Sequence, residues 1–227
     1  DKVTAFTQDP HFRHLLGQRE STFSLADALD NGSWIILNLS KGTLGEQAAT
    51  LGSLFLAKLK AAVFARRSRR PFTLFLDEVQ NLVAMDDSLE TLFSEARKFA
   101  VSVLSANQYL GQYPPAMRAS ILAVNSHIFF RLSGKDAQAM AAMCDGGTSL
   151  ARILKTLPQR RMVVRIGGGR AVEARVPHLE IPDEDTADLI RRCRDRFCRP
   201  RREVEAAIRL RHRQARQNQD EVLDGWD

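Results

Sequence analysis

The chain has 227 residues, of which 44% are hydrophobic and 26% charged, and its formal net charge is +6. This composition is typical of a globular protein with one sizeable core, and it argues against a disordered, collagen-like or disulfide-stapled chain. Three unevenly spaced cysteines (Cys144, Cys193 and Cys198) indicate reduced thiols. No apolar run approaches the roughly 20 residues that cross a bilayer, so we expect neither a transmembrane segment nor a signal peptide.

The first part of the chain predicts helices followed by a buried strand. Residues 1–31 have weak helical patterning and are interpreted as lead-in helices. The continuous apolar run 34–39 is typical of a strand that is buried on both faces. Thr43 and Glu46 have the spacing of a capping box, which predicts the start of a helix that ends near residues 66–70.

The strand and helix patterns then alternate. Strands are predicted at residues 72–76, 101–105 and 128–132, and helices at 88–100, 116–124 and 136–143. This alternation predicts a mostly parallel sheet covered by helices on both sides. Residues 161–166 and 170–176 flank three glycines and predict a β-hairpin.

The tail from residue 182 predicts one or two polar helices, and most of the basic charge lies there. Residues 191–216 contain eleven arginines and three acids, a local balance of +8, which leaves −2 for the rest of the chain. Clustered arginines can neutralise nucleic-acid phosphates. A solvated helical tail is the other interpretation, favoured because only Phe197 could stack on a base.

Two adjacent carboxylates, Asp77 and Glu78, follow the predicted strand 72–76. Ligands of open α/β sheets bind at the carboxyl ends of the strands. In nucleotide hydrolases an aspartate there holds Mg²⁺, and a neighbouring acid can polarise the attacking water. Taken alone, such a pair more often solvates a loop or caps a helix.

The spacing of further polar residues strengthens the nucleotide interpretation. Arg97 lies nineteen residues after Glu78, immediately before the next strand, and that strand leads to Asn107 and Gln108. A single βαβ unit would therefore align a metal-binding acid, a base and an amide at one sheet edge.

With this order of residues the sequence resembles the FtsK/HerA superfamily of hexameric, ATP-driven DNA translocases, and within it the conjugative coupling and VirB-type ATPases of type IV secretion. In that family an apolar strand ending in Asp-Glu, a helix ending in a Gly-Arg-like step and a strand ending in Gln recur in this order. The resemblance covers residues 10–180, and it is specific as a set of motifs rather than motif by motif. Further segments that carry it are residues 16–23, 37–42, 94–98, 125–131 and 135–137.

The resemblance implies roles for individual residues. Asp77 would be the Walker B aspartate that holds Mg²⁺, directly or through water, Glu78 the catalytic glutamate and Gln108 the sensor of the γ-phosphate. Arg97 would be the arginine finger, although Ala96 stands where many members have glycine. A solvated arginine at a helix end is the alternative for Arg97. Arg131, at the end of its strand, would be a second cationic group at the nucleotide.

The resemblance also implies a fold, cofactors and partners. The class would be α/β, with a RecA-like, mostly parallel sheet, a carboxyl-terminal hairpin and a basic helical tail. We expect lead-in helices over 1–31, the carboxyl-terminal half of an ATPase domain over 32–180 and the tail over 181–227. The cofactors would be ATP and Mg²⁺. The partners would be DNA, the other subunits of a homo-hexameric ring and type IV secretion components, with a cytoplasmic location or one peripheral to the inner membrane.

One motif of the family is absent. The sequence contains no Gly-x-x-x-x-Gly-Lys-Ser/Thr, so it lacks the loop whose amides and lysine hold the β- and γ-phosphates. We therefore expect this chain, which begins with Asp1, to be the carboxyl-terminal half of such a motor and to be inactive alone. A catalytically silent module with the same fold and a repair-type DNA translocase or helicase remain as alternatives.

Overall fold

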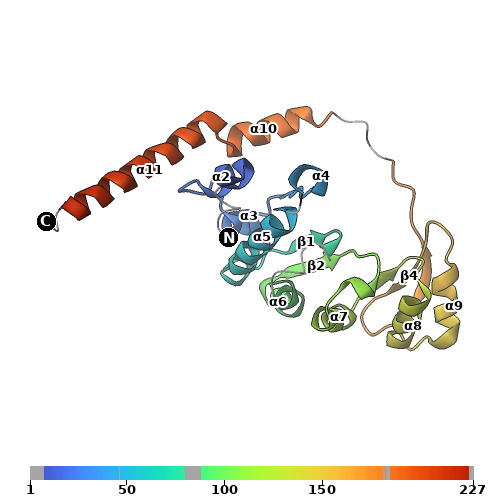
Figure 1. The fold of residues 1–227 in the computed structure, drawn as a ribbon. Helices are drawn as coiled ribbons and strands as arrows, with labels where there is room; N and C mark the ends of the chain where they lie inside the picture. Colours follow the sequence, from blue (N-terminus) through green and yellow to red (C-terminus); the bar gives the residue numbers. More distant parts are fainter. Residues whose placement is uncertain (1–7, 46, 80–87, 181, 183–184, 225–227) are drawn as a thin grey trace. The chain divides into compact units, whose positions relative to one another are not determined.

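A computed structural model describes residues 8–45, 47–79, 88–180, 182 and 185–224 of the chain. The chain forms two compact units. One unit extends from residue 25 to residue 180, and the other combines the two ends of the chain, up to residue 24 and from residue 181 onward. Figure 1 labels their elements in chain order. None of the described helices is long and apolar enough to span a bilayer.

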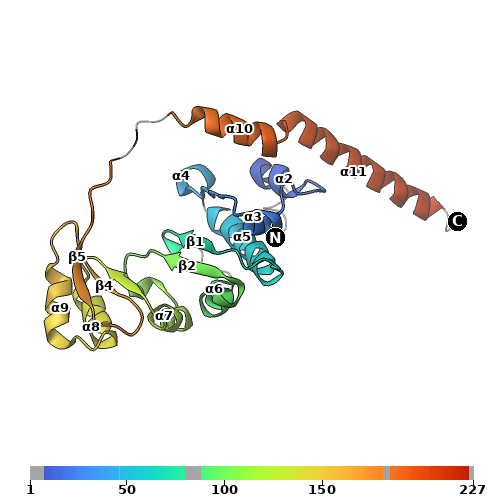
Figure 2. The same ribbon diagram turned by 180° about the vertical axis from the view of Figure 1, so that it is seen from behind.

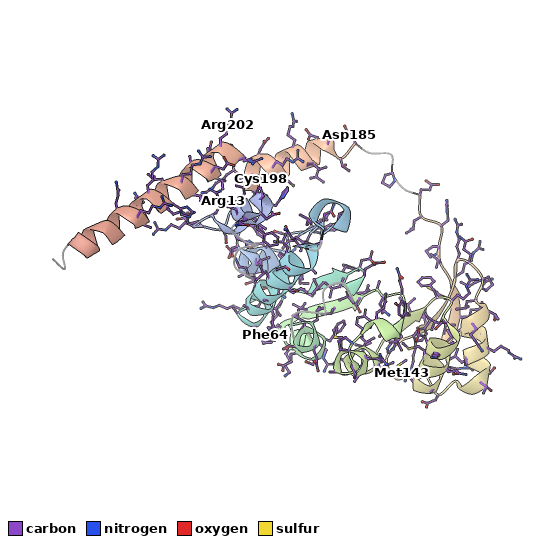
Figure 3. The ribbon with its side chains drawn as sticks, viewed as in Figure 1. Arg13, Phe64, Met143, Asp185, Cys198 and Arg202 are labelled. Carbon is purple, nitrogen blue, oxygen red and sulfur yellow. The ribbon has the colours of Figure 1, made fainter. Side chains whose placement is uncertain are left out.

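The larger unit begins with two helices that contact each other, α3 (Leu25–Asn31) and α5 (Gln47–Phe64). The helix α5 forms because its apolar residues recur at helical spacing, and the side chains of Leu56, Leu59 and Val63 are buried in the core. At its end Phe64, labelled in Figure 3, packs on Phe99 with 5.0 Å between the ring centroids.

Two parallel strands follow, β1 (Phe72–Leu76) and β2 (Val101–Ser105), with the bounds that the sequence predicts. Their register pairs Phe72 with Val101 and Leu76 with Ser105. The connection contains α6 (Ser88–Glu95) and the 3₁₀ helix η3 (Ala96–Phe99). The helix predicted over 88–100 is therefore divided, and Ala100 ends it in the left-handed conformation. Figure 2 shows the two strands side by side.

The rest of this unit contains a second sheet and three helices. After the 3₁₀ helix η4 (Leu110–Gln112) come α7 (Pro115–Leu122), β3 (His127–Phe129), α8 (Gly134–Met143), α9 (Gly147–Thr156), β4 (Arg161–Arg165) and β5 (Val172–Arg175). The strands pair in the order β3-β4-β5, all antiparallel, which confirms the predicted hairpin. The helix α9 was not predicted from the sequence; it packs on α8 with Leu150 and Leu154 buried.

The predicted strand over 34–39 is wrong. The segment has no regular secondary structure, and Trp34 and Ile36 are 95% and 87% exposed. The physical reason is that a strand needs a hydrogen-bonded neighbour, and the described strands pair only within β1-β2 and β3-β4-β5. The described residues accordingly form two small sheets, one parallel and one antiparallel, instead of the single, mostly parallel sheet that was expected.

The predicted capping box is also wrong. Thr43 lies within the short helix α4 (Lys41–Leu44), and α5 begins only at Gln47. The backbone of a capping residue must lie outside helical geometry, and residue 43 does not meet this condition. Glu46, its expected partner, lies outside the described residues.

The described residues of the smaller unit contain three helices, α2 (Pro10–Leu16), α10 (Ala187–Phe197) and α11 (Arg201–Asp224). Asp9 caps α2, since its carboxylate accepts hydrogen bonds from the amides of His11 and Phe12. α2 contacts α11, and Phe12, Val204 and Ile208 of these two helices are buried. The polar helices predicted for the tail are thus confirmed.

Candidate functional site

Backbone hydrogen bonds of Ala106, the residue after β2, hold the carboxyl ends of β1 and β2 together. The amide of Ala106 donates to the carbonyl of Leu76 at 2.8 Å, and the amide of Val79 donates to the carbonyl of Ala106 at 3.5 Å. Val79 is completely buried. The two residues between Leu76 and Val79 therefore leave the sheet at the same edge as the segment that follows β2.

This arrangement brings Glu78 and Gln108 into direct contact. The side-chain amide of Gln108 donates a hydrogen bond of 2.7 Å to Oε1 of Glu78. The backbone amide of Glu78 donates to Oδ1 of the neighbouring Asp77 at 3.0 Å. All three side chains are exposed. The structure thus unites, at one sheet edge, the two carboxylates and the amide that the sequence placed at the ends of two different strands.

Glu78 has an unusual backbone conformation. Its φ angle is +48°, in the left-handed region that residues other than glycine rarely adopt. This conformation costs on the order of 1 to 2 kcal/mol for an L-residue with a Cβ atom. It persists because the buried Val79 and the Ala106 hydrogen bonds hold the chain on both sides. Backbone strain of this kind is common at functional sites, and Glu78 accepts the hydrogen bond from Gln108 in this conformation.

The donor set at this edge suits a magnesium ion only in part. Mg²⁺ binds through one or two carboxylates plus substrate phosphates, and Asp77 with Glu78 supplies two such carboxylates. The described residues contain no group of three or more His, Cys, Asp or Glu that could hold a metal by themselves. Phosphate oxygens would therefore have to complete the coordination.

A cavity of about 1030 Å³ lies beside the two carboxylates. It is lined by the 32–40 segment, one face of α5 and β1, and Asp77 and Glu78 are among its lining residues. Most of the other side chains in its wall are apolar, and its lining residues include no lysine that could hold the phosphates of a nucleotide. The residues present fit a metal and the end of a phosphate chain, but not a whole nucleotide.

Arg97, one of the two predicted cationic residues, does not join this site within its own chain. Arg97 lies in η3, and the carbonyl of Ala100 just beyond it accepts a hydrogen bond from the amide of Phe72 at 3.0 Å. Arg97 is therefore near the start of β1, whereas Glu78 follows its end, and five strand residues span about 16 Å. Arg131 lies after β3 in the other sheet, and both arginines are exposed.

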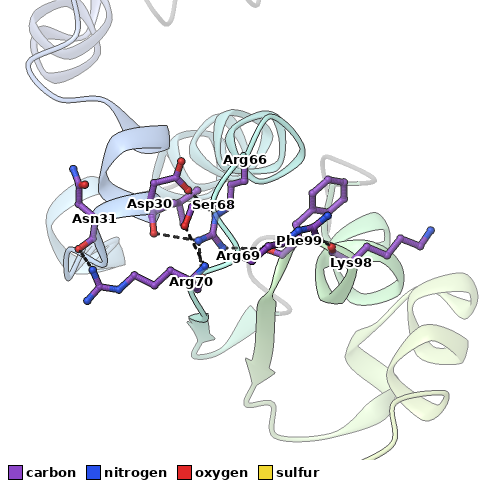
Figure 4. Close-up of polar contacts among 9 residues, drawn as sticks. Asp30, Asn31, Arg66, Ser68, Arg69, Arg70, Lys98 and Phe99 are labelled. Carbon is purple, nitrogen blue, oxygen red and sulfur yellow. Dashed lines mark hydrogen bonds and ion pairs between the residues drawn. The ribbon is translucent and has the colours of Figure 1, made fainter.

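The turn that carries Arg97 is held by a buried arginine that the sequence analysis did not single out (Figure 4). The side chain of Arg66 is fully buried and donates to Oδ1 of Asp30 at 3.0 Å. It also donates to the carbonyls of Phe99, Leu29 and Arg70 at 3.0, 3.3 and 2.6 Å. Arg69 donates to the carbonyl of Lys98. Arg66 and Arg69 thus fix the end of η3 against the ends of α3 and α5.

We expect Arg66→Ala to lower the free energy of unfolding by about 3 kcal/mol, because it leaves Asp30 and three backbone carbonyls without their donor. Arg67→Ala is the matched control, since Arg67 is exposed and should change stability by less than about 0.5 kcal/mol. Urea unfolding of the full chain measures both. Equal losses in the two variants would contradict the structural role of Arg66.

A second residue without a predicted site role positions the segment after Gln108. The nearly buried carboxylate of Asp136 accepts a hydrogen bond from the backbone amide of Leu110 at 3.3 Å. Asp136 lies in the first turn of α8, and its own amide donates to the Ser133 hydroxyl at 3.4 Å. The Ser-x-x-Asp spacing in the sequence could have indicated this helix start.

Comparisons with known proteins give a fold but no family. No family model and no curated protein matches the chain. Among solved structures it is similar to the plasmid coupling protein TrwB in complex with ADP and Mg²⁺ (TM-score 0.56, 18% identity, 72% of this chain and 45% of that chain). It is also similar to the unbound monoclinic form of the conjugative coupling protein TrwBdeltaN70 (TM-score 0.56, 16% identity, 79% and 46%).

VirB4 of Thermoanaerobacter pseudethanolicus is a further similar structure, with a TM-score of 0.49, 14% identity and coverage of 61% of this chain and 40% of that chain. The chain thus spans less than half the length of each of these proteins. At these identities the likeness to the two TrwB structures shows a shared α/β fold, and the function of this chain has to be argued from its own residues.

Proposed function

We propose that this chain is the carboxyl-terminal half of the ATPase domain of a conjugation or type IV secretion motor. The observation that carries the proposal is the hydrogen bond between Gln108 and Glu78 at the ends of neighbouring parallel strands. It joins the base and the sensor that such an ATPase needs at one edge of the sheet. The likeness to TrwB, a coupling protein seen with ADP and Mg²⁺, supports the same assignment.

In this proposal each residue has one task. When bound, Mg²⁺ supplies positive charge at the phosphate chain. Asp77 holds that ion, and Glu78 orients the attacking water and accepts its proton. Gln108 fixes Oε1 of Glu78 and senses the γ-phosphate. Arg97 and Glu78 of one chain lie near opposite ends of β1, which is about 16 Å long. This separation suits an arginine finger that acts at the nucleotide site of a neighbouring subunit.

The wider assignment follows from the same resemblance. The motor would assemble as a ring of identical subunits and transfer DNA, next to type IV secretion components at the inner membrane. Arg131 would contact the nucleotide as a second cation. The phosphate-binding loop would come from a segment outside this sequence.

Nucleotide affinity tests this division of labour. The 227 residues alone should bind Mg·ATP with a Kd no tighter than about 1 mM, because the described site contacts only a metal and the end of the phosphates. The same residues joined to a P-loop half from their own reading frame should bind at least tenfold more tightly. Isothermal titration calorimetry measures both. Micromolar affinity of the 227 residues alone would contradict the proposal and require a phosphate site within them.

A further inference from the structure

The helix α11 carries a row of arginines that the proposed ATPase site does not use. Arg202, Arg209, Arg213 and Arg216 are spaced by seven, four and three residues, so they lie along one side of the helix. The row extends over about 21 Å at 1.5 Å per residue. We refer to these four residues as the arginine row.

Most of the arginine row has no anionic partner within the part of the chain that the structure describes. Glu205 is the nearby acid, and its carboxylate already contacts Arg201 at 3.1 Å, His14 at 3.0 Å and Arg209 at 3.8 Å. No described acid pairs with Arg202, Arg213 or Arg216, and all three are exposed. Figure 3 shows Arg202 projecting from α11 away from α2.

The apolar side of α11 is already occupied. Val204 and Ile208 are 6% and 4% exposed, and α11 contacts α2 on this side. The bond from Arg211 to the carbonyl of Gly17 further secures α11 to α2. The arginine row is therefore presented on a helix that is fixed by its opposite side.

We propose that the arginine row binds the phosphate backbone of a nucleic acid without reading its sequence. Guanidinium groups that lie along one side of a helix can release the counterions of a polyphosphate, and this release drives such binding. An anionic membrane is the weaker partner, because a helix that lies in a membrane buries an apolar face. The apolar face of α11 packs on α2. Among the side chains of α11 that the structure describes, Leu210 is the large hydrophobic one that stays exposed.

The arginine row would be an additional binding surface of the proposed motor. Because its binding to nucleic acid needs neither ATP nor the strand-end site, this proposal and the proposed ATPase function can fail separately. Binding of the full chain to a fluorescent DNA duplex of arbitrary sequence is measured by anisotropy at several salt concentrations. The triple variant Arg202→Gln, Arg213→Gln, Arg216→Gln should bind about 100-fold more weakly at 0.1 M salt. The slope of the logarithm of the binding constant against the logarithm of the salt concentration should become shallower by about one unit for each arginine removed.

A matched variant removes the same charge elsewhere. Arg152→Gln, Arg170→Gln, Arg175→Gln changes three exposed arginines of the larger unit and should leave affinity and slope near those of the unaltered chain. Equal losses in both triple variants would overturn the proposal, because net charge alone would then explain binding. Circular dichroism of both variants checks that the helices remain.

Vesicles of phosphatidylserine and phosphatidylcholine test the membrane alternative. The full chain used for this measurement contains α10, whose exposed Leu189 and Ile190 could also contact a membrane. The proposal expects weaker binding to vesicles than to the duplex at equal charge concentration. Tighter binding to vesicles, or no binding of the unaltered chain to the duplex, would overturn it.

Discussion

In a protein that joins these residues to their P-loop half, we expect Glu78→Gln to lower kcat for ATP by about 10²- to 10⁴-fold while ATP still binds. The amide cannot accept the proton of the attacking water, whereas Asp77 keeps its carboxylate for the metal. The geometry should survive, because the oxygen of the new amide can still accept the hydrogen bond from Gln108. Steady-state ATPase rates and nucleotide titration measure the two effects separately.

Glu90→Gln is the matched control for this change. Glu90 is an exposed acid in the first turn of α6, outside the strand-end site, and its substitution should leave kcat unchanged. An unaltered rate in Glu78→Gln would remove the catalytic glutamate from the proposal. Equal losses in Glu78→Gln and Glu90→Gln would show a general effect of lost negative charge.

The second large effect concerns Arg97. Arg97→Ala should lower ATP hydrolysis by about 10³- to 10⁵-fold, the usual contribution of an arginine finger. Its position near the start of β1, away from Glu78 of its own chain, predicts that the finger acts across a subunit boundary. Mixing Arg97→Ala subunits with Glu78→Gln subunits should then restore partial activity, because some boundaries pair an intact Glu78 with an intact Arg97.

The control for this mixing experiment is a chain that carries both substitutions. Mixed with Arg97→Ala subunits, it offers no intact Arg97 at any boundary, so the rate should stay at background. The measurement is ATPase rate against mixing ratio, with subunit exchange verified by fluorescence energy transfer. A rate that remains the sum of the two single variants at every ratio would mean that Arg97 does not act in trans.

The sequence by itself determined the local elements around the candidate site. Strands 72–76 and 101–105 were predicted with their observed bounds, because each is a short, largely apolar run. Their parallel pairing followed from the helix between them, and parallel strands end at one sheet edge. That rule alone placed Asp77 and Glu78 near Gln108.

Only the tertiary structure decided which groups found partners. The apolar run 34–39 satisfies the local rules for a strand, yet it pairs with none of the described strands. Arg66 is one of several arginines at a helix end in the sequence, but it alone among them is buried. Asp30 and the carbonyls of Leu29 and Phe99 reach it from other segments. The left-handed backbone of Glu78 depends on the buried Val79 and on hydrogen bonds to the next strand. In each case the outcome depends on contacts between residues far apart in the chain, which local patterns do not contain.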